Sequence, residues 1–143
     1  MILPDANLLL YAVDETARHH EPAASWLEEL LSGSETVAMS WMVMTAFLRI
    51  ATNARLYEHP RSVDEAFGIV QGWLDRGSTT IVTPTRRHLQ RMSELLATTG
   101  VGGNLVNDAH LAALAIEHGA TLHSADHDFA RFPGLAWHNP LAG

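Results

Sequence analysis

The sequence predicts an α/β fold in which a parallel β-sheet is covered by helices on both faces. Short apolar or β-branched runs alternate with helical patterns along the chain, and this alternation is typical of βαβ units. The chain has 143 residues, of which 47% are hydrophobic, so it is long enough to bury a full core. We therefore expect one domain over residues 1–143.

Five segments have the composition and length of short strands. Right-handed crossovers between parallel strands place the strand ends on a common edge of the sheet. In open α/β sheets this edge forms the ligand-binding crevice. In chain order the predicted strands are Met1–Pro4, Thr36–Met39, Thr79–Val82, Thr121–His123 and Leu135–His138.

Apolar residues at helical spacing predict six helices between these strands. The first begins at Asn7, and the second opens at Pro22 and stops at Gly33. Trp41–Ala51 is apolar almost all round, which is typical of a buried helix. The remaining three predicted helices are Val63–Leu74, Arg86–Leu96 and Leu105–Ile116.

The composition excludes several classes of protein. The chain has no cysteine, so disulfides, thiolate metal sites and cysteine nucleophiles are ruled out. No apolar stretch is long enough to cross a bilayer, and Pro4 and Asp5 interrupt the first apolar run, which argues against a signal peptide. We therefore expect a cytoplasmic protein. The net charge of −7 argues against a protein that coats nucleic acid, but a nuclease with acids around metal ions remains compatible with it.

Four aspartates stand where predicted strands end or a predicted helix begins. Asp5 follows the first strand, Asp108 lies near the start of the last helix, and Asp126 and Asp128 follow the fourth strand. Because parallel strands end at one edge, we expect these carboxylates to form a single acidic pocket. Mg²⁺ or Mn²⁺ would remove their mutual repulsion and would activate water for phosphodiester hydrolysis.

Most of these aspartates also have a purely structural interpretation. Asp108 could cap its helix or complement the helix dipole. Asp126 and Asp128 could build an Asx-turn. Asp5 directly follows an apolar strand, and no turn signal explains it. Asn7 could cap the first helix or orient Asp5 by hydrogen bonding, and capping is the favoured interpretation.

Five segments, taken in order, carry a resemblance to a known family: ILPDAN (2–7), AFLRI (46–50), GNLVNDAHLA (103–112), SADHDF (124–129) and FPGL (132–135). The chain resembles the PIN-domain ribonucleases, in particular the VapC toxins of bacterial toxin–antitoxin pairs, over nearly its whole length. The resemblance implies a three-layer α/β/α sandwich with a central, mostly parallel, five-stranded sheet. It also implies cleavage of RNA with Mg²⁺ or Mn²⁺, inhibition by a VapB-type antitoxin, and a homodimer.

The family's metal-binding aspartates map onto Asp5 and Asp108, and its C-terminal acid maps onto Asp126. The resemblance therefore assigns the metal to these three residues and adds Asp128 as an auxiliary member of the catalytic group.

One position departs from the family pattern. Many PIN domains carry a further acid, usually glutamate, in the helix after the second strand. No Asp or Glu occurs from residue 36 to residue 57, and Ala46 stands where the glutamate is expected. A catalytically impaired PIN module that binds RNA or an antitoxin is therefore an alternative function. A phosphatase with Asp5 as its nucleophile is another, although such folds have Asp-x-Asp and Asn7 occupies the third position here.

The histidines and tryptophans are weaker candidates for a functional site. Zinc ligation by His110, His123 and His127 is disfavoured because their spacing matches no zinc motif. The tryptophans are expected in the core or at a subunit contact rather than as base-stacking platforms; the three considered are Trp26, Trp41 and Trp73.

Arginines raise two further expectations. Arg49 lies in a very apolar segment and is expected to need a charged partner. The start of the helix predicted from residue 86 is basic and could contact RNA phosphates or simply face solvent, with neither interpretation preferred; its members are Arg86, Arg87, His88 and Arg91.

Overall fold

The computed structural model describes residues 1–142, which contain a five-stranded sheet in the order β3-β2-β1-β4-β5. Every pairing in this sheet is parallel, so the sheet expected to be mostly parallel is entirely so in the part of the chain described. The strands are β1 (Ile2–Pro4), β2 (Val37–Met39), β3 (Thr79–Ile81), β4 (Thr121–His123) and β5 (Trp137–His138).

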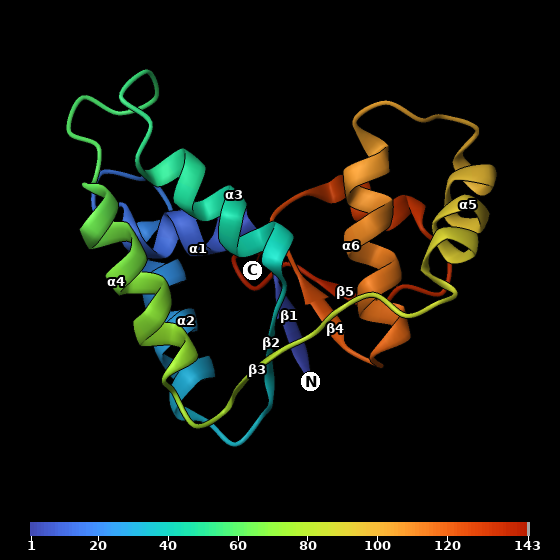
Figure 1. The fold of residues 1–143 in the computed structure, drawn as a ribbon, viewed down its shortest axis with the longest axis horizontal. Coiled ribbons are helices and arrows are strands. Elements are labelled where there is room, and N and C mark those ends of the chain that lie inside the picture. The colour runs from blue at the N-terminus through green and yellow to red at the C-terminus, as the bar shows by residue number, and fades with distance from the viewer. Residues whose placement is uncertain (143) are drawn as a thin grey trace.

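Helices cover both faces of the sheet, as predicted. Four helices, α1 to α4, pack against one another on one face, and α5 and α6 pair on the other (Figure 1). This is the three-layer α/β/α arrangement. The helices are α1 (Ala6–Val13), α2 (His20–Ser32), α3 (Trp41–Ala51), α4 (Val63–Leu74), α5 (His88–Thr99) and α6 (Leu105–Glu117), and a 3₁₀ turn, η1, spans His127–Arg131.

The helix boundaries follow local chemistry. Ser40 caps α3 by accepting a hydrogen bond from the Val43 N–H at 3.2 Å. Helix α5 starts two residues later than Arg86 and runs on to Thr99, where Gly100 adopts a left-handed conformation with φ of 67°. Glycine meets no steric penalty there, so it ends the helix. Within residues 1–142, none of the helices has the length and apolarity to cross a membrane.

Helix α3 is less buried than its composition predicted. One face enters the core, where Phe47 packs edge-on against Trp73 with ring centroids 4.8 Å apart. Trp41, Thr45 and Arg49 are spaced four residues apart and share the face turned to solvent. The expectation that Arg49 needs a charged partner is therefore wrong, because the side chain is exposed and water can solvate its guanidinium group.

The order of the strands fixes where a ligand can bind. The chain builds β1, β2 and β3 outward in one direction and then crosses to the other side of β1 to add β4 and β5. The crevice at such a switch point opens at the carboxyl ends of the two central strands. Here Pro4 pairs with His123 at those ends, so the residues after them, Asp5 and Ser124, emerge side by side.

Candidate metal centre

Asp5 is fixed by hydrogen bonds at the end of β1. One carboxylate oxygen accepts a hydrogen bond from the Ala6 N–H at 2.7 Å, which caps α1. The other accepts a hydrogen bond from the Ser124 hydroxyl, also at 2.7 Å. Burial raises the pKa of Asp5 above its usual 3.8, and the two hydrogen bonds oppose this rise. Asp5 is therefore a positioned acid with little remaining freedom to rotate.

Ser124 joins the ends of the two central strands. Its side chain is fully buried, and its hydroxyl accepts hydrogen bonds from the Asp126 N–H at 3.1 Å and from the Asn7 amide at 3.3 Å while it donates to Asp5. Asn7 also accepts a hydrogen bond from the Ala125 N–H at 3.5 Å. The capping role expected for Asn7 thus belongs to Asp5. Sequence reasoning missed Ser124, although a serine directly after a buried strand was a usable signal.

Three of the predicted acids meet at this edge. Asp108, Asp126 and Asp128 each offer a carboxylate oxygen, and these oxygens lie within 4.8 Å of one another. Asp108 comes from the first turn of α6. Asp126 caps η1 by accepting a hydrogen bond from the Asp128 N–H at 2.9 Å, so the Asx-turn interpretation also holds. Asp5 is outside this closest group, which includes Asp128 in its place.

The four carboxylates act on one another electrostatically. The pKa of Asp108 rises from 3.8 to about 6, first because of burial and then because of the negative charges of Asp126, Asp5 and Asp128. Asp126 likewise raises the pKa of Asp5. A group of hard oxygen donors that repel one another and are partly desolvated fits Mg²⁺ or Mn²⁺, because the cation replaces repulsion with attraction.

The histidines considered as zinc ligands make three separate contacts. His110 hydrogen-bonds to His88 between their ring nitrogens at 2.8 Å. His123 accepts a hydrogen bond from the Trp26 indole N–H at 3.0 Å. The His127 ring packs edge-on against Trp137. Trp26 and Trp73 are thus structural, whereas Trp41 is 56% exposed.

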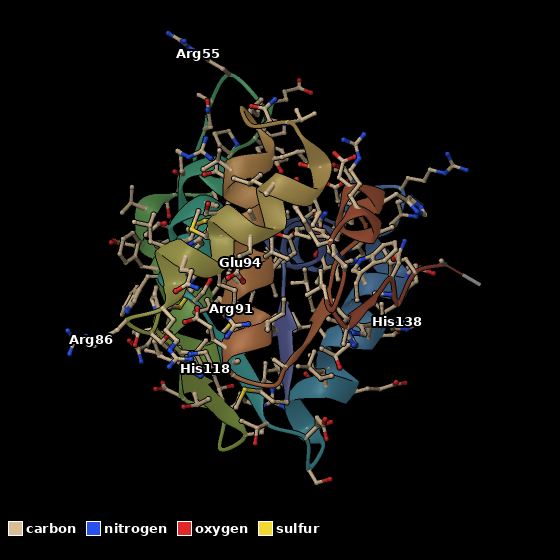
Figure 2. The ribbon with its side chains drawn as sticks, turned by 90° about the vertical axis from the view of Figure 1, so that its right-hand side faces the viewer. Arg55, Arg86, Arg91, Glu94, His118 and His138 are labelled. Carbon is tan, nitrogen blue, oxygen red and sulfur yellow. The ribbon has the colours of Figure 1, made fainter. Side chains whose placement is uncertain are left out.

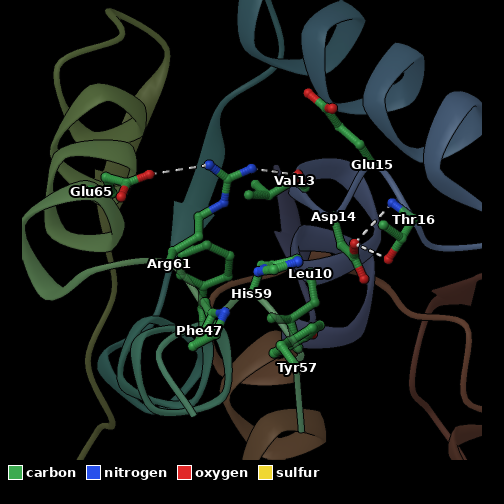
Figure 3. A pocket seen from close by; sticks show the side chains of 12 residues that line it. Leu10, Val13, Asp14, Glu15, Thr16, Phe47, Tyr57, His59, Arg61 and Glu65 are labelled. Atoms are coloured by element: carbon green, nitrogen blue, oxygen red, sulfur yellow. Dashed lines mark hydrogen bonds and ion pairs between the residues drawn. The ribbon is translucent and has the colours of Figure 1, made fainter. Parts of the chain in front are cut away.

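A pocket of about 440 Å³ lies away from the acidic edge, between the end of α1, helix α3 and the loop before α4 (Figure 3). Phe47, Tyr57 and His59 line it beside Arg61, whose guanidinium donates a hydrogen bond to the Val13 carbonyl at 2.9 Å. None of the four clustered aspartates lines this pocket. The chemistry of the carboxylates, not the size of the hollow, therefore marks the functional site.

Comparison with known proteins identifies the family. Residues 2–135 match the PIN domain. The chain is 46% identical over 142 residues to ribonuclease VapC37 of Mycobacterium tuberculosis, with 99% of both chains covered. It is 39% identical over 141 residues to ribonuclease VapC33 of the same organism, again with 99% of both covered.

Solved structures share the fold. The VapBC2 complex of Rickettsia felis, bound to a DNA fragment from its promoter, matches with a TM-score of 0.69 and 24% identity over 97% of this chain and 98% of that one. VapBC-1 of nontypeable Haemophilus influenzae matches with a TM-score of 0.69 and 18% identity over 99% of this chain and 100% of that one. The chain therefore belongs to the PIN-domain family and, within it, to the VapC ribonucleases.

Proposed function

We propose that this protein is a metal-dependent endoribonuclease that acts in the cytoplasm as the toxin of a toxin–antitoxin pair. The observation that carries the proposal is the group of aspartates at the crevice between β1 and β4. It occurs in a chain that is 46% identical to a ribonuclease over 99% of its length. RNA is the substrate, and phosphodiester hydrolysis is the reaction.

The aspartates differ in their proposed contribution to the metal site. Asp5, Asp108 and Asp126 would hold Mg²⁺ or Mn²⁺, and Asp128 lies close enough to Asp108 and Asp126 to contribute as well. When bound, the ion supplies a water of lowered pKa and neutralises charge on the phosphate. Ser124 is a positioning residue, because its hydroxyl fixes the orientation of the Asp5 carboxylate.

The proton competes with the cation at this site. With the pKa of Asp108 at about 6 in the absence of a cation, this carboxyl is protonated in a substantial fraction of molecules near pH 6. A metal ion must displace that proton before it binds. We therefore expect metal affinity to rise with pH between about 5 and 7.

The decisive experiment is cleavage of labelled RNA by purified, antitoxin-free protein with Mn²⁺ or Mg²⁺. Asp5→Asn and Asp108→Asn should each lower the rate by more than about 100-fold, the upper end of what loss of an outer-shell partner costs a metal site. Asp64→Asn is the matched control, since Asp64 is an exposed acid in the first turn of α4. Circular dichroism shows whether each variant folds. We expect 5′-phosphate and 3′-hydroxyl ends, because the nucleophile is water.

The same assay also tests the alternative function, a PIN module that binds without cleaving. Ala46 leaves α3 without the acid that many PIN domains carry, and this observation favours a module that binds RNA or antitoxin without cleaving it. If no RNA is cut across a range of metals and substrates while RNA still binds, that alternative replaces ours. The phosphatase hypothesis is dropped, because the chain belongs to the PIN-domain family.

Two partners complete the proposal. A VapB-type antitoxin should inhibit the enzyme, as the VapBC complexes among structures of the same fold suggest. Co-expression with the product of the neighbouring reading frame, followed by the cleavage assay, tests this. We propose a homodimer from the family to which the chain belongs. Light scattering of the purified protein gives its mass.

A further inference from the structure

Arg91 occupies an unusual place in α5. Helix α5 packs against α6 through an apolar stripe formed by Met92, Leu95 and Leu96, and the half-buried Arg91 lies beside this stripe. Its Nε–H is buried and has no hydrogen-bond partner among residues 1–142. A buried donor of a charged group is costly to leave unpaired, and such a group in a native protein calls for an explanation such as a missing ligand.

A second arginine lies one turn earlier on the same helix. Arg87 and Arg91 both line a hollow of about 180 Å³ together with Gln90 and Glu94. Like charges four residues apart on a helix repel each other. No carboxylate of the described residues lies within 4.0 Å of a guanidinium nitrogen of Arg87 or Arg91. Glu94 instead accepts a hydrogen bond from the Gln90 amide at 3.1 Å.

Arg91 also borders open space on its other side. A hollow of about 260 Å³ lies between α5, the end of α6 and the turn at residues 133–134, and Arg91, Thr98 and Ile116 line it. In Figure 2, Arg91 lies near Glu94 in the region where α5 covers α6, whereas Arg86 extends into solvent. The half-buried Arg91 side chain thus borders two hollows, while its Nε atom itself is buried.

The chemistry of this place suits a phosphate group. Guanidinium groups bind phosphate through paired N–H donors in a fixed fork. The N-terminus of α5, which begins at His88 after the N-cap residue Arg87, adds positive potential. Because the overall charge is −7, local clusters of positive charge such as these arginines favour the approach of a polyanionic ligand.

The place is separate from the acidic edge. Arg91 lies beside Ile116, which follows Asp108 by eight residues on α6. At 1.5 Å of rise per residue this is a distance of about 12 Å along the helix. A single-stranded RNA with its reacting phosphate near Asp108 would therefore need only a short extension to bring another phosphate to Arg91.

We propose that Arg91, together with Arg87, forms a phosphate-binding subsite on α5, distinct from the aspartate group. Its ligand is a phosphodiester of the RNA strand or a free phosphate ion. The RNA source depends on the proposed ribonuclease function, whereas phosphate binding itself does not.

The first test compares thermal unfolding in phosphate and in chloride at equal ionic strength. The wild type, Arg91→Gln and Arg55→Gln are measured. Arg55→Gln removes the same charge from an exposed side chain that Figure 2 shows at the top of the view, away from Arg91. Phosphate stabilises proteins generally, and this general increase in melting temperature should be shared by all three. The wild type and Arg55→Gln should show a further increase that Arg91→Gln lacks.

Two more variants separate this subsite from a simple ion pair. Arg91→Lys keeps the charge without the fork and should retain part of the phosphate response. Glu94→Gln should enlarge the response, because it removes the acid beside the site. In chloride, Arg91→Gln should be at least as stable as the wild type, because the substitution removes the buried, unpaired Nε–H of Arg91. An equal phosphate response in Arg91→Gln and wild type would overturn the proposal, as would equal destabilisation of Arg91→Gln and Glu94→Gln in chloride.

The second test identifies the source of the phosphate. Binding of single-stranded RNA is measured without metal, in chelator, at several salt concentrations. If RNA supplies the phosphate, the slope of log K against log salt becomes shallower by about 0.7 in Arg91→Gln and stays unchanged in Arg55→Gln. If Arg91→Gln keeps the salt slope of the wild type but loses the increase in melting temperature in phosphate, the ligand of the subsite is free phosphate. Because this test measures binding and not cleavage, a negative result would not contradict the ribonuclease proposal, which the cleavage assay tests separately.

Discussion

Replacing Asp108 with asparagine should stabilise the metal-free protein while it abolishes activity. In the folded protein, burial and the charges of Asp126, Asp5 and Asp128 raise the pKa of Asp108 from 3.8 to about 6. Between these two pH values the folded chain keeps a proton that the unfolded chain has released. The stability of the wild type therefore falls as pH rises through this interval. Above about pH 6 the whole penalty is present, and Asp108→Asn removes it.

The size of the effect follows from the same pKa. A rise from 3.8 to about 6 corresponds to roughly 3 kcal/mol at 1.36 kcal/mol for each pH unit. Asp108 is only half-buried, so water screens part of this interaction, and we expect about 1.5 kcal/mol. For a chain of this size that is about 5 °C in melting temperature. At pH 4.5 the advantage of the variant should shrink to about one third.

The assay is thermal unfolding of wild type and Asp108→Asn in chelator at pH 4.5 and pH 7.5. Asp64→Asn, which removes an exposed acid from the first turn of α4, is the control and should show no such dependence on pH. Adding Mg²⁺ at 100 times its Kd should stabilise the wild type by about 2.7 kcal/mol and the variant far less. If Asp108→Asn were less stable than wild type at pH 7.5, Asp108 would be a structural cap and the electrostatic argument would fail.

The remaining predictions concern two hydrogen-bonded groups. Ser124→Ala removes the hydroxyl that donates to Asp5 and should cost about 1 kcal/mol of stability. In the cleavage assay this variant should also lower kcat and move the acidic limb of the pH–rate profile to higher pH. A serine with a purely structural role would not produce that shift. Glu117→Gln should cost about 2 kcal/mol at pH 7, because the Glu117 side chain is 2% exposed and pairs with His88. Burial raises the pKa of Glu117, but the hydrogen bonds from His88 and Thr85 outweigh burial and leave it lowered. Denaturant titrations should therefore show this loss above about pH 4.5 and a smaller one as pH falls through the lowered pKa.

Most of the fold could be predicted because its signals are local. The alternation of strands and helices predicted the three layers, and the stop at Gly33 marked where α2 ends. The start of α5 could not be predicted, since the residues before it are held by a long-range contact: the Thr85 N–H donates to Glu117 at 3.0 Å. The burial of α3 was overestimated because apolar composition does not show which face lacks a neighbour, as Trp41 demonstrates.

The convergence of the aspartates at one edge was predictable from the sequence, whereas the geometry of the group was not. The placement of Asp5 and Asp126 after β1 and β4 follows from parallel topology. That the carboxylates of Asp108, Asp126 and Asp128 form the closest group depends on how η1 turns and where α6 docks. The hydrogen bond from Ser124 to Asp5 depends on the register of β1 with β4. These are three-dimensional facts that no spacing in the sequence records.

The capping interpretation of the aspartates and the proposed metal site are compatible with each other. Asp5 caps α1, Asp126 caps η1, and Asp108 lies in the first turn of α6. Helix N-termini carry partial positive charge that stabilises acids, so the convergence of these ends offsets part of the repulsion in the metal-free protein. Capping uses only one oxygen of Asp126, the one that accepts from the Asp128 N–H, and leaves the other for a cation. Capping bonds thus position Asp5 and Asp126, whereas Asp108 lies in the first turn of α6 without such a bond. A substitution at Asp5 or Asp126 that spares the cap but removes the charge should separate capping from the proposed metal binding.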